Sequence, residues 1–263
     1  MPMADIGGAR IHYQDSGTGK EVVLLLHAFP LHAGMWSRQV EALKARYRVI
    51  APDYPGLGKS EPRAEPSTMD LLATDILALL QNVRVSRAFV VGCSMGGYLA
   101  FEIYRRAPSL FRGLGLCDTR AAADTPEGAQ NREKFAQTAL EKGLSWVADE
   151  MTPKLLKPTP EPAAAKEVRA LIGAGTPAGV AAAQRGMAKR PDSTPTLAKV
   201  TCPTVVVVGE EDTLTPPPEA EKMAAGIRGA KLVKIAGAGH LPNIENPKVF
   251  NETLLGFLAN LPA

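Results

Sequence analysis

Cysteine, histidine and aromatic side chains are scarce in this 263-residue chain. It has three cysteines and four histidines, and 5% of its residues are aromatic. The cysteines lie in or beside apolar runs, and their odd number leaves at least one unpaired, which favours reduced, buried thiols over a disulfide framework. Because the sequence shows no cluster of ligating side chains, we expect neither a metal nor an organic cofactor. Reduced thiols predict a cytoplasmic protein.

Long apolar runs and runs of one charge are also missing. The segment VVLLL at 22–26 is far shorter than the ~20 residues that span a bilayer, and residues 1–10 lack the pattern of a secretory signal. The 30 lysines and arginines are interleaved with 27 acidic residues, which argues against a nucleic-acid-binding surface. We therefore expect a small-molecule partner, no membrane or nucleic-acid contact, and a monomer or homodimer.

Short strand-like runs alternate with helix-like segments over much of the chain. Apolar residues fill 22–26, 88–92 and 204–208 without a break, as in strands buried on both faces of a parallel sheet. Other strand-like runs are 10–14, 47–51, 113–117 and 231–235, and helix-like segments are 35–46, 68–82, 96–106, 218–227 and 246–260. This alternation predicts an α/β fold with a mostly parallel, doubly wound sheet.

The alternation stops between residues 121 and 197. Helix-like pieces there (127–142, 145–150, 163–173 and 178–189) are separated by prolines, which we interpret as helix breakers. We predict a core made of 1–120 and 198–263, with 121–197 inserted between two strands as a helical cap. Such a lid would cover the carboxyl edge of the sheet, where open α/β sheets bind ligands.

A serine between two glycines follows the apolar run 88–92. The sequence GCSMG, with Gly92, Ser94 and Gly96, fits the G-x-S-x-G nucleophile elbow, a sharp turn from strand to helix that exposes a serine hydroxyl. The alternative is a glycine-rich turn used for packing or phosphate binding, although the lysine of a phosphate loop is missing.

A serine hydroxyl becomes a good nucleophile only when a base removes its proton and an acid orients that base. His240, in GAGHLPNIENP, is the one histidine after Ser94. Asp212, in GEEDTLTPP, is the predicted acid because it lies one strand–helix–strand step before His240. Asp118, which follows the strand-like run 113–117, is the alternative candidate for this acid. A solvated acidic loop around Asp212 and a surface role for His240 are the alternatives without chemistry.

Acyl transfer also needs donors for the developing oxyanion, usually backbone N–H groups. The candidates are the amide of Met95, which follows the serine, and the amide of Phe29 in HAFP, because Pro30 has no N–H. We expect His27 to support this loop without performing chemistry.

Four further side chains are candidates for the substrate site. Leu214, Leu241 and Trp146 could line an apolar pocket. Arg120 could bind a substrate carboxylate, but an ion pair with Asp118 or Asp124 is the stronger interpretation. Asp53 and Ser60 in APDYPGLGKS we expect to fix a loop through hydrogen bonds.

With these motifs in this order, the chain resembles the α/β-hydrolase fold superfamily over nearly its whole length. The segments that carry the resemblance are LLLHAFP, APDYPGLGKS, GCSMGG, VVVVGEEDTLTPP and GAGHLPNIENP. The chain is most similar to small bacterial carboxylesterases, enol-lactonases and cofactor-free perhydrolases, and departs from many relatives at Ala28, where they carry glycine.

The resemblance implies a serine hydrolase, with a carboxylesterase of small esters or lactones as the favoured activity. An enol-lactonase or a C–C bond hydrolase with the same triad is an alternative. A non-catalytic small-molecule receptor on the same scaffold is the alternative from another class. Fold alone does not choose among them.

Overall fold

An eight-stranded sheet forms the centre of the computed structural model, which describes residues 2–64 and 66–260. The strand order is β1-β2-β4-β3-β5-β6-β7-β8, and every pair from β4 to β8 is parallel, whereas β1–β2 and β2–β4 are antiparallel. The strands are β1 (Met3–Ile6), β2 (Ala9–Ser16), β3 (Val22–Leu26), β4 (Arg48–Pro52), β5 (Ala88–Cys93), β6 (Phe111–Cys117), β7 (Thr204–Gly209) and β8 (Lys231–Ile235).

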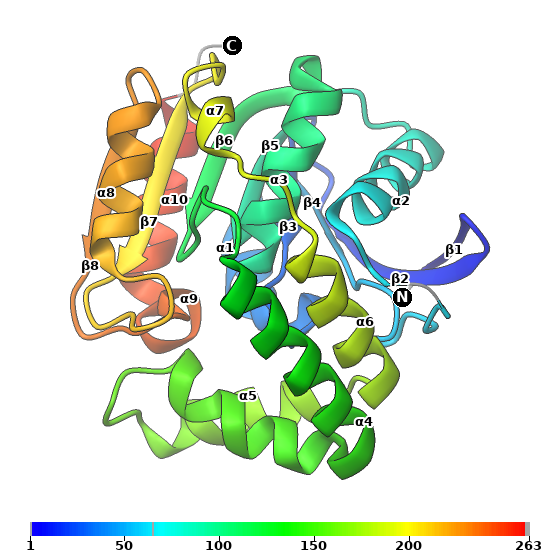
Figure 1. The fold of residues 1–263 in the computed structure, drawn as a ribbon. Coiled ribbons are helices and arrows are strands. Elements are labelled where there is room, and N and C mark those ends of the chain that lie inside the picture. The colour runs from blue at the N-terminus through cyan, green and yellow to red at the C-terminus, as the bar shows by residue number, and fades with distance from the viewer. Residues whose placement is uncertain (1, 65, 261–263) are drawn as a thin grey trace.

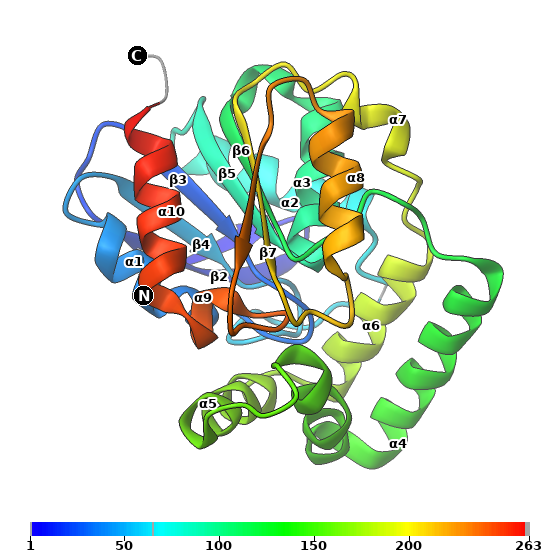
Figure 2. The ribbon, with the colours of Figure 1, turned by 90° about the vertical axis from the view of Figure 1, so that its left-hand side faces the viewer.

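Helices cover both faces of this sheet, as expected for a doubly wound α/β fold (Figures 1 and 2). Helices α1 and α10 lie on one face, and α2, α3 and α8 lie on the other (Figure 2). The helices are η1 (Ala33–Trp36), α1 (Ser37–Leu43), α2 (Met69–Asn82), α3 (Met95–Arg106), η2 (Pro108–Leu110), α4 (Pro126–Leu155), α5 (Pro162–Gly173), α6 (Pro177–Ala188), α7 (Thr194–Leu197), α8 (Pro217–Gly226), α9 (Pro242–Glu245) and α10 (Pro247–Ala259).

The uninterrupted apolar runs form central strands of the sheet, where both faces are covered by helices. Every residue of β5 and β7 is buried, because helices press on both faces of the sheet there. The predicted fold class is therefore confirmed. The strand β1 was not predicted from the sequence, since its four residues give too short a pattern.

Helices α4 to α7 lie between β6 and β7 in the chain. In space, α4 and α5 lie beyond the carboxyl ends of the strands, whereas α7 lies near the opposite ends, beside α8 (Figures 1 and 2). Prolines begin α4, α5 and α6, as their fixed φ favours at a first turn. Pro153 lies inside α4, where we expected a break. Gly143, with φ of +76°, instead kinks this helix between the two predicted pieces. The cap boundaries at 121 and 197 stay a prediction.

The helices of 2–64 and 66–260 contain no stretch that combines the length and the hydropathy of a membrane span.

Candidate active site

Ser94 lies at the sharp turn between β5 and α3. Its φ of +53° and ψ of −113° are rare for a residue with a side chain, and such strain is typical of a nucleophile elbow. Its backbone N–H donates to the carbonyl of Cys117 at 2.9 Å, and its carbonyl accepts from the hydroxyl of Thr119 at 2.8 Å. These bonds hold the strained residue against the end of β6 and the loop that follows it.

The two glycines around Ser94 are required by close approach of the backbone. A Cβ at Gly92 would lie 2.2 Å from the carbonyl oxygen of Gly96, and a Cβ at Gly96 would lie 2.1 Å from that of Leu26. Neither contact is sterically allowed, so the turn is this tight only with glycine at both positions. The flanking glycines thus let helix α3 begin directly against strand β3.

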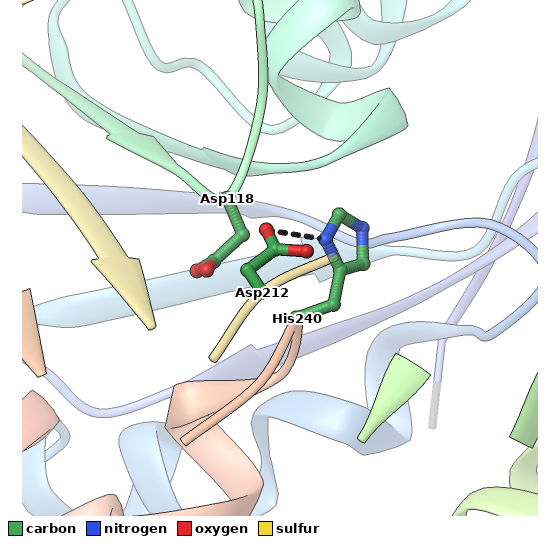
Figure 3. A group of neighbouring side chains, drawn as sticks. All are labelled: Asp118, Asp212 and His240. Carbon is green, nitrogen blue, oxygen red and sulfur yellow. Dashed lines mark hydrogen bonds and ion pairs between the residues drawn. The ribbon is translucent and has the colours of Figure 1, made fainter. Parts of the chain in front are cut away.

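His240 and Asp212 form a buried pair beside this turn (Figure 3). The loop after β8 carries His240, whose Nδ1 lies 2.8 Å from Oδ2 of Asp212, in the loop after β7. The hydroxyl of Thr215 donates to the same oxygen at 2.7 Å, and the amides of Leu214 and Thr215 donate to Oδ1.

These donors keep the Asp212 carboxylate ionised. Burial alone would raise the pKa of Asp212, but the attraction of His240 and the hydrogen bonds from His240 and Thr215 outweigh burial, and the pKa lies below its usual value. An ionised Asp212 holds the Nδ1–H tautomer of His240, which leaves a lone pair on Nε2 to accept a proton.

Asp118, the competing acid, lies behind Asp212 and makes no bond to the imidazole (Figure 3). One oxygen accepts from the amide of Gly209 at 2.8 Å, and Oδ2 is buried without a partner among the described residues. Burial, and next the negative charge of Asp212, raise the pKa of Asp118 well above its ordinary value. The geometry therefore pairs His240 with Asp212, whereas burial favours the protonated form of Asp118.

Asp118, Asp212 and His240 also bring three metal-ligating atoms within 4.8 Å of one another. The Asp212 oxygens are already engaged by four donors, and Nδ1 of His240 uses its proton on Asp212. A metal would have to displace these bonds. We therefore interpret the group as a hydrogen-bonded acid–histidine pair with a second buried carboxyl, that of Asp118, beside it.

The two predicted oxyanion donors are free in the part of the chain that the structure describes. Neither the amide of Phe29, after β3, nor that of Met95, at the first turn of α3, donates to a described residue. His27 positions the first of these loops, because its Nδ1 donates to the carbonyl of Ala28 and its Nε2 accepts from the amide of Tyr54. Burial lowers the pKa of His27 to about 4, so it stays neutral as a structural residue.

The loop after β4 has the supporting network that the sequence suggested. Asp53 accepts from the amides of Ala33 and Lys59 and from Nδ1 of His12. The hydroxyl of Ser60 donates to the carbonyl of Asp53 and accepts from the amide of His12. These buried bonds fix the loop that underlies the Phe29 segment.

A cavity of about 290 Å³ opens on Ser94 and His240, and we name it the Ser94 cavity. No hydrogen bond within the described residues engages the Ser94 hydroxyl or Nε2 of His240, so both can act on a molecule in the cavity. Its apolar lining consists of Phe29, Tyr98, Phe135, Met151, Met187 and Leu214.

Of the three predicted substrate contacts, Leu214 lines this cavity and the other two differ from the prediction. Leu241 is fully buried in the hydrophobic core and does not line the cavity. Trp146 lies behind Phe135, with ring centroids 4.9 Å apart, so Phe135 and not Trp146 faces the cavity.

Arg120 lines the cavity and forms an ion pair with Asp124 at 2.8 Å. This is one of the two ion pairs that the sequence suggested for it. Arg132, which we did not predict, also lines the cavity and pairs with Asp124. Nothing in the local sequence marks Arg132, since it is one of several charged residues on α4.

Known proteins are similar to this chain in both sequence and fold. The model of a family described as the alpha/beta hydrolase family matches residues 23–253. The 3-oxoadipate enol-lactonase 1 of Acinetobacter baylyi is 30% identical over 235 residues, which cover 87% of this chain and 85% of that protein.

Two solved structures are similar over almost their full length. A thermophilic esterase from Thermogutta terrifontis, with malate bound, has a TM-score of 0.94 and 39% identity, covering 97% of this chain and 95% of that one. The enol-lactonase of Burkholderia xenovorans LB400 has a TM-score of 0.90 and 28% identity, covering 98% of this chain and 100% of that one. On this evidence, the chain belongs to the alpha/beta hydrolase family.

Proposed function

We propose that the protein is a serine hydrolase, a carboxylesterase that cleaves small carboxylic esters through an acyl-enzyme on Ser94. The observation that carries the proposal is that His240, paired with the buried Asp212, lines one cavity with Ser94, which is held in a strained turn. A serine alone, or a histidine alone, would not give a nucleophile with its base already oriented.

The reaction follows from the roles of these atoms. Nε2 of His240 takes the proton as the Ser94 oxygen attacks the ester carbonyl, and Asp212 stabilises the charged imidazole. The amides of Phe29 and Met95 donate to the oxyanion, each worth about 3–4 kcal/mol in the transition state. His240 then protonates the departing alcohol, and a water activated by His240 cleaves the acyl-enzyme.

An enol-lactonase is the second candidate, since the relatives include two enol-lactonases that match most of the chain. A lactone is an internal ester, so the same residues would open it without a separate alcohol leaving. A C–C bond hydrolase would use the same triad on a different substrate. Parallel assays with a linear aryl ester, an enol-lactone and a vinylogous diketone separate the three.

We also propose that residues 121–197 act as the cap of this site. Helix α4 supplies Arg132, Phe135 and Met151 to the Ser94 cavity, and α6 supplies Gln184 and Met187. Since the core contributes the reacting groups and these helices much of the remaining lining, the cap would select the substrate.

Burst kinetics test the proposed chemistry. With p-nitrophenyl acetate we expect a burst of nitrophenol followed by slower turnover, and no burst in Ser94→Ala. Wild-type protein that binds ester analogues but gives neither burst nor turnover on any activated ester would favour the receptor.

A further inference from the structure

Three arginines surround one carboxylate at the wall of the Ser94 cavity. Asp124, with 3% of its side chain exposed, accepts from Arg120 at 2.8 Å, from Arg190 at 2.6 Å, and from Nε of Arg132. Burial alone would oppose ionisation, but the hydrogen bonds from Arg190 and Arg132 lower the pKa of Asp124 to about 2. The cluster therefore has three positive charges and one negative charge.

Arg190 is the structural partner of Asp124. Its side chain is 2% exposed, it donates to the carbonyls of Met187 and Ala122, and its guanidinium stacks on the ring of Tyr98 at 4.2 Å. Arg190 is not part of the cavity lining. One arginine and one carboxylate thus neutralise each other inside the cap.

Arg120 and Arg132 remain as surplus charge, and both line the Ser94 cavity. Arg132 completes its contacts with neutral groups, Oε1 of Gln184 at 2.9 Å and Sδ of Met187. Nε of Arg120 is buried and has no partner among the described residues. Asp124 carries a single negative charge, which its two oxygens share among three guanidinium groups.

The rest of the lining does not balance these cations. Among the described residues that line the cavity, Asp124 is the only carboxylate, whereas Lys154, a further cation, pairs with Glu150 at 3.3 Å. Partly buried cations of this kind are costly unless an anion accompanies them. An anion bound in the cavity that Ser94 and His240 line would supply the counter-charge.

We propose that Arg120 and Arg132 bind a carboxylate of the substrate, so that the protein acts on small esters or lactones that carry a free carboxylate. This inference rests on the proposed hydrolase function and names its substrate class. The planar guanidinium groups suit a carboxylate through charge-assisted hydrogen bonds. The apolar lining between them and Ser94, including Phe135 and Leu214, would hold the carbon chain that joins the carboxylate to the scissile ester.

Two matched pairs of esters test the proposal. The first pair, mono-p-nitrophenyl glutarate and p-nitrophenyl pentanoate, differs by a carboxylate on the acyl side. The second pair, 4-carboxyphenyl and 4-carbamoylphenyl pentanoate, differs by a carboxylate on the alcohol side. We expect wild type to prefer the anionic member of at least one pair by kcat/KM, and Arg120→Gln and Arg132→Gln each to reduce that preference by about 10- to 100-fold.

Arg185→Gln is the matched control, because Arg185 is also a cap arginine in an ion pair, with Glu133, but does not line the cavity. It should keep the wild-type preference. Circular dichroism should show that all three variants fold, and Arg185→Gln should also keep the wild-type turnover of the neutral esters. No preference in wild type for either anionic ester, or equal losses in Arg185→Gln, would overturn the proposal.

A binding measurement keeps the proposal separate from the chemistry. By calorimetry, glutarate should bind wild type and Ser94→Ala more tightly than pentanamide does, and Arg132→Gln should lose that difference. Glutarate binding without hydrolysis of any ester would reject the hydrolase and leave the carboxylate site in place. Ester hydrolysis with no tighter binding of glutarate would reject the carboxylate site alone.

Discussion

Replacing each of two neighbouring aspartates by asparagine separates the acid that orients His240 from the acid that does not. Asp212 accepts four hydrogen bonds, two from backbone amides on Oδ1 and two, from Thr215 and His240, on Oδ2. In Asp212→Asn the amide oxygen must stay toward the fixed backbone donors, so the NH₂ group replaces Oδ2. That NH₂ faces Nδ1 of His240 as a donor.

Nδ1 of His240 must then accept, which moves the imidazole proton to Nε2. An Nε2–H tautomer cannot take the proton of Ser94. We expect kcat to fall about 10⁴-fold, which corresponds to about 5.5 kcal/mol of lost transition-state stabilisation at ~1.4 kcal/mol per tenfold.

Asparagine at 118 should behave differently. Burial favours the protonated form of Asp118, and an amide resembles a protonated carboxyl in shape and can still accept from the amide of Gly209. We expect Asp118→Asn to keep kcat within about threefold of wild type, a change below 1 kcal/mol. Steady-state kinetics with an activated ester compare both variants, with circular dichroism as the folding control. Equal losses in the two variants, or a larger loss at 118, would refute the reasoning.

Three further predictions concern stability. Gly96→Ala places a Cβ 2.1 Å from the Leu26 carbonyl, so urea unfolding should show a loss of about 3 kcal/mol or more, whereas Gly256→Ala, with open space around its Cβ, should cost nothing. Burial raises the pKa of Asp118 in the folded state, so the unfolded chain loses this proton first as the pH rises above 3.8. Above that pH, the free energy of unfolding of wild type should fall relative to that of Asp118→Asn by up to about 1.4 kcal/mol per pH unit. A constant difference between the two proteins from pH 4 to pH 8 would contradict this prediction. The lowered pKa of His27 affects stability at acidic pH. The contribution of His27 to the free energy of unfolding is fully present above pH 6.5, and it falls by up to about 1.4 kcal/mol per pH unit as the pH drops toward 4. The same denaturant titrations should show no such slope from this site in His27→Gln, and an unchanged slope would exclude His27 as its source.

The elements that the sequence predicted best were those whose own pattern determines them. Unbroken apolar runs gave β5 and β7, and a serine between glycines gave the turn at Ser94. These features depend on neighbours close in the chain. The choice between Asp118 and Asp212 could only be argued from spacing, because both follow adjacent parallel strands and only the loop conformation decides which one reaches the imidazole.

The predictions that failed depended on packing between distant segments. Leu241 is next to His240 in sequence yet fully buried, and Trp146 is separated from the cavity by Phe135, which comes from the other half of the kinked helix α4. Arg132 reaches the cavity because α4 and α6 pack together around Asp124. No local pattern records such a meeting of helices.

Covalent labelling of Ser94 tests the central claim most directly. A fluorophosphonate probe reacts with a serine only when a base activates it, so intact mass should show one adduct per chain, located in the tryptic peptide 88–105 that contains Ser94 and no other serine. The adduct should be absent from Ser94→Ala and form far more slowly in His240→Gln. Labelling elsewhere, or labelling of folded Ser94→Ala at the wild-type rate, would contradict the account.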